Sequence, residues 1–155
     1  MPKKIIAESE VEIEALKVLE NLGYEILIGP DIAPDSLYAE RDDYSEVLLF
    51  GRIEQAIDRI NPDIPVEGKE DALKKLKSIS STSLIEDNME FHRLLTDGID
   101  AEYLDENRDL KSKKVQLFDF NNVDNNNFLA VSQFTVIENE KNRRPDIVIL
   151  LMGYR

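Results

Sequence analysis

The pattern of apolar residues changes at Gly98, and this change limits the fold more than any other feature of the sequence. Before Gly98, apolar residues recur at the three- and four-residue spacing of amphipathic helices, apart from one short strand over 24–28. After Gly98, they form short runs rich in branched and aromatic side chains, which favour strands. Helices followed by a mixed β-sheet predict an α+β fold, built as one layered domain over residues 1–155.

The first predicted helix begins at Ser9. Ser9 and Glu12 have the S-x-x-E spacing of a capping box, in which two side chains satisfy free backbone N–H groups at a helix start. Gly23 is predicted to end this helix, because glycine readily adopts the left-handed conformation found after a helix C-terminus. The side chains expected to be buried on it are Val11, Ala15, Val18, Leu19 and Leu22.

Three further helices are predicted over 45–60, 71–79 and 84–95, after an acidic surface loop at 31–43. The first of the three should stop at Asn61-Pro62, because proline disfavours helical backbone in the residue before it. The side chains expected to be buried on that helix are Val47, Leu48, Ile53, Ala56, Ile57 and Ile60.

Four strands are predicted in the second part of the chain, over 101–104, 115–120, 128–137 and 147–152. The asparagine-rich segment 121–127 is predicted to be a turn between two of them, since asparagine tolerates the left-handed conformations that turns need.

The net charge of -13, from 32 acidic and 19 basic residues, argues against a free-standing DNA-binding protein. DNA affinity normally comes from a basic surface that neutralises phosphates, so if the protein acts on DNA, something other than this chain must hold it. The chain has no cysteine, which excludes thiolate catalysis and cysteine-based zinc sites. No apolar run approaches the roughly 18 residues of a membrane span, and no secretory signal is evident. A cytoplasmic location without membrane attachment is therefore expected.

Pro145-Asp146 is the candidate metal site. Four Pro-Asp dipeptides occur, but only this one opens a continuous apolar run, Ile147-Val148-Ile149-Leu150-Leu151-Met152. A carboxylate at the mouth of a buried strand is held in place by the strand and open to water, which suits a magnesium ion. The alternative is that Pro-Asp merely ends a loop and starts a strand.

The chain resembles the N-terminal region of the motor-and-nuclease (R) subunits of type I restriction enzymes. Three blocks carry the resemblance: LENLGYEILIGPDIAPD, RINPDIP, and the long stretch from LIEDNMEFHRLLTDG to NRRPDIVIL. Together they extend over nearly the whole chain from Glu8 onward. The resemblance implies a nuclease of the PD-(D/E)xK superfamily, in which an Asp and a Glu bind Mg²⁺ and a Lys assists the chemistry.

By this resemblance, Asp146 is the metal-binding aspartate and a catalytic residue. The family's Glu-x-Lys should follow within about twenty residues, and the chain has no counterpart of it. Nor does it contain the Gly-x-x-x-x-Gly-Lys-Ser/Thr loop with which a motor domain would bind ATP. The resemblance thus implies a restriction-endonuclease-like core that ends before its site is complete, and we expect the chain alone to be inactive.

Glu12 is the second candidate catalytic residue, because many nucleases of this fold place a supporting acid on the first helix; Glu14 is the second choice for that position. The competing interpretation makes Glu12 only the acid of the capping box. Lys141, Arg143 and Arg144 form a compact basic group near Asp146. They are either a solvated hairpin tip or nucleic-acid-binding residues that contact phosphate. His92, the only histidine, is predicted to be a packed or surface residue.

The functional hypothesis is that the parent subunit pulls double-stranded DNA with ATP and cuts it with Mg²⁺. The resemblance implies that methyltransferase and specificity subunits are its partners and recognise the DNA site. The alternative is a non-enzymatic docking module, in which the helices between Ser45 and Leu95 bind those subunits or the motor.

Overall fold

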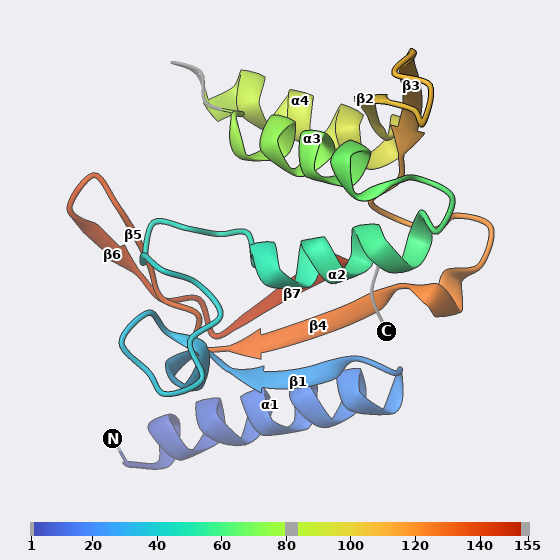
Figure 1. Cartoon of the computed structure of the whole chain (residues 1–155). Helices are drawn as coiled ribbons and strands as arrows, with labels where there is room; N and C mark the ends of the chain where they lie inside the picture. Colours follow the sequence, from blue (N-terminus) through green and yellow to red (C-terminus); the bar gives the residue numbers. More distant parts are fainter. Residues whose placement is uncertain (1, 80–83, 153–155) are drawn as a thin grey trace. The chain divides into compact units, whose positions relative to one another are not determined.

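The computed structural model describes residues 2–79 and 84–152, which divide between two compact units. Of these residues, the sheet unit comprises 2–51 and 127–151, and the helical unit comprises 52–79, 84–126 and Met152. The described residues form four α-helices, seven strands and two 3-10 helices, so the predicted α+β class is confirmed (Figure 1). No helix within the described ranges is both long and apolar enough to cross a membrane.

Three strands form the sheet of the sheet unit, in the order β1-β4-β7. They are β1 (Glu25–Ile28), β4 (Asn127–Ser132) and β7 (Ile147–Met152). β1 and β4 are parallel, with Glu25 opposite Leu129 and Ile28 opposite Ser132. The central strand supplies the core, because Leu129, Ala130 and Val131 are fully buried. The long helix α1 (Pro2–Asn21) runs alongside β1 (Figure 1).

α1 begins at Pro2, so the predicted start and capping box at Ser9 are wrong: Ser9 lies inside the helix. Proline suits a first helical position, because its missing N–H would have no partner there, and the residues that follow include several good helix formers. The predicted end at Gly23 is confirmed. Gly23 has φ 97, its N–H donates to Glu20 O, and the N–H of Tyr24 donates to Leu19 O. This pair of bonds is a Schellman motif.

The buried face of α1 differs from the prediction. Val11, Val18 and Leu22 are exposed, at 69%, 57% and 70%. The half-buried side chains are those of Glu12, Ala15, Leu16 and Leu19. The helix is therefore rotated so that an acidic residue, and not Val11, faces the sheet side. Hydrophobic spacing alone did not identify this face, because apolar residues lie on most sides of the helix.

The strand predicted over 128–137 is broken at Gln133, which has φ 55. β4 ends at Ser132, and the chain resumes as β5 (Val136–Glu138) in a separate two-stranded hairpin with β6 (Lys141–Arg143). The hairpin turns at Asn139 and Glu140, which both have positive φ, as a two-residue type I′ turn requires. The final predicted strand is confirmed as β7, although Ile149 is 47% exposed. β7 lies at the edge of the described sheet, and the exposure of Ile149 shows that one of its faces is not fully covered.

The helical unit packs α3 (Val66–Lys77) against the antiparallel hairpin of β2 (Ile99–Leu104) and β3 (Leu110–Val115). α4 (Leu84–Asp97) confirms the last predicted helix, and Gly98 ends it with φ 82. α3 begins at Val66, earlier than predicted, and Gly68 in its first turn lies close to Tyr103. A Cβ at Gly68 would lie 2.9 Å from the Tyr103 ring.

Two other boundaries differ from the prediction. The helix expected from Ser45 is α2 (Phe50–Ile60), because Asp43 accepts hydrogen bonds from both the backbone and the hydroxyl of Ser45 and forms a turn there. Val47, predicted to be buried, is 50% exposed.

The strand expected over 115–120 is wrong: the strand of this region is β3, which ends at Val115. Buried Asn61 bonds the backbone N–H and C=O of Gln116 and so takes the place of a partner strand. The predicted stop of α2 at Asn61 is confirmed.

Candidate active site

Glu12, Gln133 and Asp146 meet at one end of the sheet unit, although they come from three separate segments. The side-chain amide of Gln133 donates to both carboxylate oxygens of Glu12, at 3.1 and 3.2 Å. The same nitrogen lies 3.4 Å from Oδ1 of Asp146. The two candidate acids, 134 positions apart by number (146 minus 12), thus share one amide group. Sequence analysis named both acids but did not find the glutamine between them.

The backbone fixes this arrangement at Gln133. The N–H of Gln133 donates to the backbone oxygen of Asp146 at 2.9 Å, which joins the end of β4 to the start of β7. On the other side, a Cβ at Gly29 would overlap the backbone carbonyl of Gln133. Because only glycine leaves room there, Gly29 permits β1 to end directly against the left-handed residue. Asp146 itself is exposed, and Glu12 and Gln133 are half-buried.

Arg41 anchors the segment that follows Gln133. Arg41 is 4% exposed, and its guanidinium donates to the backbone oxygens of Tyr44, Glu46 and Thr135. It also lies 4.0 Å from the centre of the buried Phe134 ring, a cation–π contact. Burial lowers the pKa of Arg41 from its usual value, while Tyr44 and Glu46 oppose that shift. Arg41 thereby ties the loop after β1 to the two residues next to Gln133.

The two carboxylates provide part of the ligand set that a hard divalent cation needs. Mg²⁺ is usually held by one or two carboxylates and completes its shell with water, and Glu12 and Asp146 provide two carboxylates at a site open to solvent. The Gln133 amide donor lies among three of their oxygens, where a positive charge would also be favoured. Among the side chains that the structure describes, no group of three or more Asp, Glu, His or Cys residues is placed to hold a metal. Glu12 and Asp146 are therefore suited to be two of the ligands of a Mg²⁺ site.

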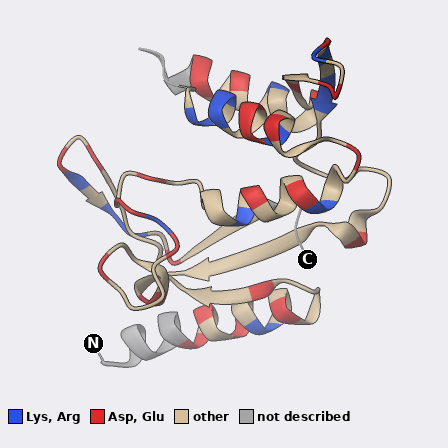
Figure 2. Cartoon of the chain, in the orientation of Figure 1, with Lys and Arg blue, Asp and Glu red and all other residues tan. Residues whose placement is uncertain are grey.

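The basic group lies on the hairpin that precedes Asp146. Lys141 and Arg143 belong to β6 and Arg144 follows it, on the hairpin whose Lys and Arg segments are blue in Figure 2. All three residues are exposed. None of the ion pairs found between described residues includes them. These three residues therefore form an exposed basic segment, and the acidic residue Glu140 lies at the hairpin turn before it.

The asparagine-rich segment forms the predicted turn, and hydrogen bonds to Asp119 hold it together. Asp119 accepts a hydrogen bond from the Asn125 side chain at 2.9 Å, and from the backbone N–H groups of Asn122 and Asn121. These donors lower the pKa of Asp119, the Asn125 amide most strongly. Asn126, which is buried, bonds the backbone N–H and C=O of Asp119.

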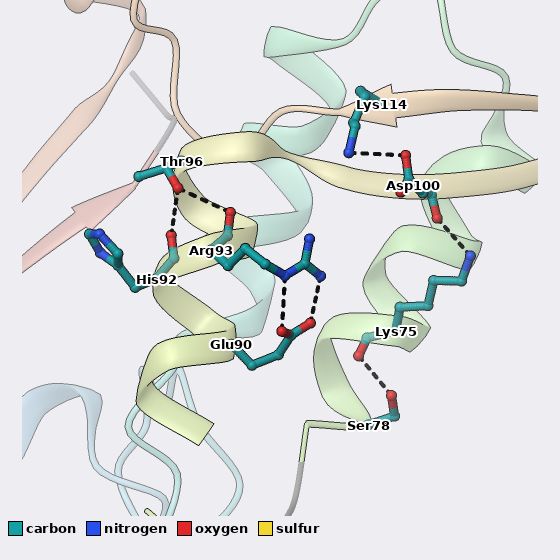
Figure 3. Close-up of polar contacts among 8 residues, drawn as sticks. All are labelled: Lys75, Ser78, Glu90, His92, Arg93, Thr96, Asp100 and Lys114. Carbon is teal, nitrogen blue, oxygen red and sulfur yellow. Dashed lines mark hydrogen bonds and ion pairs between the residues drawn. The ribbon is translucent and has the colours of Figure 1, made fainter. Parts of the chain in front are cut away.

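Polar groups of the helical unit pair both within one helix and between neighbouring elements (Figure 3). Glu90 and Arg93 form an ion pair on α4, and Lys75 donates to the backbone oxygen of Asp100. These residues line a groove of about 600 Å³ with apolar Leu94 and Ile99. His92 is exposed, as expected of a surface residue, and only its backbone oxygen bonds Thr96. The docking alternative for this region stays a prediction.

Nothing in the sequence identified Gln133 or Arg41 as residues of the site. Gln133 lies inside an apolar run that resembles an uninterrupted strand, and its left-handed backbone depends on Gly29, which is far away in the sequence, and on the backbone of Asp146. Arg41 is one of many charged residues in an acidic loop. The only hint was Gly29-Pro30, which marked where β1 ends.

With this geometry in place, comparison with known proteins is informative. Residues 5–154 match the family described as "Type I restriction enzyme R protein N terminus". The chain belongs to this family. The resemblance deduced from the sequence blocks is thus confirmed, and the match includes Glu12, Gln133 and Asp146.

Two relatives agree with this assignment. The first is the "Putative type I restriction enzyme MjaIXP endonuclease subunit" of Methanocaldococcus jannaschii, 35% identical over 97% of this chain. The second is the "Type I restriction enzyme HindI endonuclease subunit" of Haemophilus influenzae, 29% identical over 96% of this chain. In both comparisons the chain spans 14% of the relative's own length.

Proposed function

We propose that this chain serves as the N-terminal nuclease region of a type I restriction R subunit, which cuts double-stranded DNA with Mg²⁺. The observation that supports this most directly is that Glu12 and Asp146 reach a common amide from opposite ends of the chain. Two acids placed together at a solvent-open strand end are suited to phosphodiester hydrolysis, which needs a cation near the phosphate.

The positions of Asp146 and Glu12 indicate the role of each acid. Asp146 is the principal metal ligand, because it lies exposed at the start of β7 and the strand fixes its backbone. Glu12 supports the same cation from α1. When bound, Mg²⁺ would polarise the phosphate and promote ionisation of the attacking water. No Glu-x-Lys of the PD-(D/E)xK pattern follows Asp146 in the 155 residues, so the proposed nuclease site needs residues from elsewhere in the subunit.

DNA binding would depend mainly on other parts of the enzyme. With a net charge of -13, this chain is a weak candidate for holding the duplex by itself. Lys141, Arg143 and Arg144 are the local phosphate contacts, because they lie exposed on the segment leading to Asp146. Methyltransferase and specificity subunits would supply site recognition, and ATP-driven translocation would belong to motor domains of the same R subunit.

The decisive experiment is Asp146→Ala in the complete R subunit, assembled with its partner subunits. We expect DNA cleavage to fall by at least about 100-fold, since even residues behind a metal ligand cost about 10- to 100-fold when lost. ATP hydrolysis and translocation should stay near the wild-type rate, because the nucleotide site is separate. Asp124→Ala, an exposed aspartate in the asparagine-rich turn, is the matched control. Cleavage by Asp146→Ala at the wild-type rate would refute the assignment.

A further inference from the structure

Gln133 is the one side chain seen to bond both candidate metal ligands. Within the described residues, the Glu12 and Asp146 side chains form no ion pair, and Gln133 is the only side chain recorded as donating to them. Its NH₂ group has two protons to donate and carries no net charge. The two carboxylates would otherwise repel each other at neutral pH.

The backbone of Gln133 prepares it for this role. A left-handed residue ends β4, between buried Ser132 and buried Phe134, and Gly29 accommodates the resulting close approach. The fold keeps this φ of 55 in a residue that is not glycine, and such strain is found most often where function requires a particular side-chain placement. Arg41 secures Phe134 and Thr135 immediately beyond it.

We propose that Gln133 is a positioning residue that takes the place of a cation between Glu12 and Asp146. In the cation-free protein its amide holds the carboxylate oxygens together through hydrogen bonds. When a divalent cation binds, the carboxylates turn to the ion and the amide releases them. This inference rests on the proposed function, because it requires the two acids to be metal ligands.

The test compares Gln133→Met, Gln133→Glu and Gln55→Met in the 155-residue chain, with Mn²⁺ as the probe cation. Methionine keeps the length of the side chain but cannot donate, and glutamate adds a third carboxylate. Gln55 is an exposed glutamine on α2 and provides the matched control. The measurements are the melting temperature in chelator and in saturating Mn²⁺, and Mn²⁺ affinity by calorimetric titration.

We expect Gln133→Met to melt lower than wild type in chelator and to regain most of that loss in Mn²⁺, because a ligand that binds only the folded state stabilises it. Its Mn²⁺ affinity should rise several-fold, roughly threefold to tenfold, since the cation no longer displaces an amide donor. Gln133→Glu should bind Mn²⁺ more than about tenfold tighter, because added ligand charge raises cation affinity. Gln55→Met should match wild type in every measurement.

Two results would overturn the inference while leaving the metal site intact. One is an unchanged melting temperature in chelator with unchanged Mn²⁺ affinity in Gln133→Met. The other is a loss of stability of equal size with and without Mn²⁺, which would indicate packing alone. If neither wild type nor any Gln133 variant binds Mn²⁺, Glu12 and Asp146 do not form a cation site in this chain and this inference fails, whereas cleavage by Asp146→Ala in the complete subunit decides the proposed function separately.

Discussion

The sheet unit and the helical unit use polar side chains in different ways. In the sheet unit, Arg41 reaches Thr135 and Gln133 reaches Glu12, so the contacts join segments about a hundred positions apart in the chain. In the helical unit, Glu90 pairs with Arg93 and Lys75 with Asp71, both within one helical turn. Long-range polar contacts can assemble a site from distant residues, whereas pairs within one turn mainly support the helix that carries them.

This difference predicts that polar and glycine positions of the sheet unit are sensitive to substitution and that surface pairs of the helical unit are not. Asn61 is an exception in the helical unit, because its buried amide joins distant segments, and Lys75 is another, because it also donates to the backbone oxygen of Asp100. Sensitivity should therefore follow the reach of a contact and its burial, and three substitutions test this from the largest expected effect to the smallest.

Gly29→Ala should have the largest effect. The new methyl group would overlap the backbone carbonyl of Gln133, and neither backbone can move without disturbing the pairing of β1 with β4. We expect a loss of about 3–5 kcal/mol in the free energy of unfolding, in the range of severe backbone and packing defects. Chemical denaturation measures it. Gly51→Ala is the control, since a Cβ there meets no atom within 4 Å and alanine favours the helix; equal losses in both variants would contradict the close contact at Gly29.

Arg41→Met should have the next largest effect. It removes a buried guanidinium that donates to three backbone carbonyls and packs on Phe134, and it leaves those acceptors without their donor. We expect about 2–4 kcal/mol of destabilisation, because each unsatisfied buried group costs about 1–3 kcal/mol. Arg93→Met removes an exposed arginine with one ion pair on α4 and should cost less than about 1 kcal/mol. If the two variants unfold alike in urea, the contrast between the units is wrong.

Asp119→Asn should have the smallest effect at neutral pH and a clear pH dependence. Hydrogen bonds from Asn125, Asn122 and Asn121 lower the pKa of Asp119 in the folded protein. Its stabilising contribution is therefore present above the ordinary aspartate pKa of about 3.9 and disappears as the pH falls through the lower folded value. Melting temperatures of wild type and variant should differ most near neutral pH and converge in acid. A constant difference from pH 7 to pH 3 would contradict the hydrogen-bonded carboxylate.

The elements predicted from the sequence are those whose signals lie within a few residues. Gly23, Pro62 and Gly98 ended helices as expected, because backbone conformation at a helix end depends on local residue type. The boundaries that failed depended on distant partners. β3 pairs with β2 although four of its six residues are Lys or Ser, and Gln116 bonds Asn61 and does not continue the strand.

The sequence by itself determined the α+β class and the family, since apolar spacing and ordered sequence blocks are properties of the chain. It also predicted Glu12 and Asp146 as the two candidate acids. Only the tertiary structure decided that Glu12 faces Asp146 across Gln133. That arrangement requires the rotation of α1, the left-handed backbone at the end of β4 and the space above Gly29 to occur together. Each depends on atoms more than a hundred residues away along the chain, and no local pattern encodes such a contact.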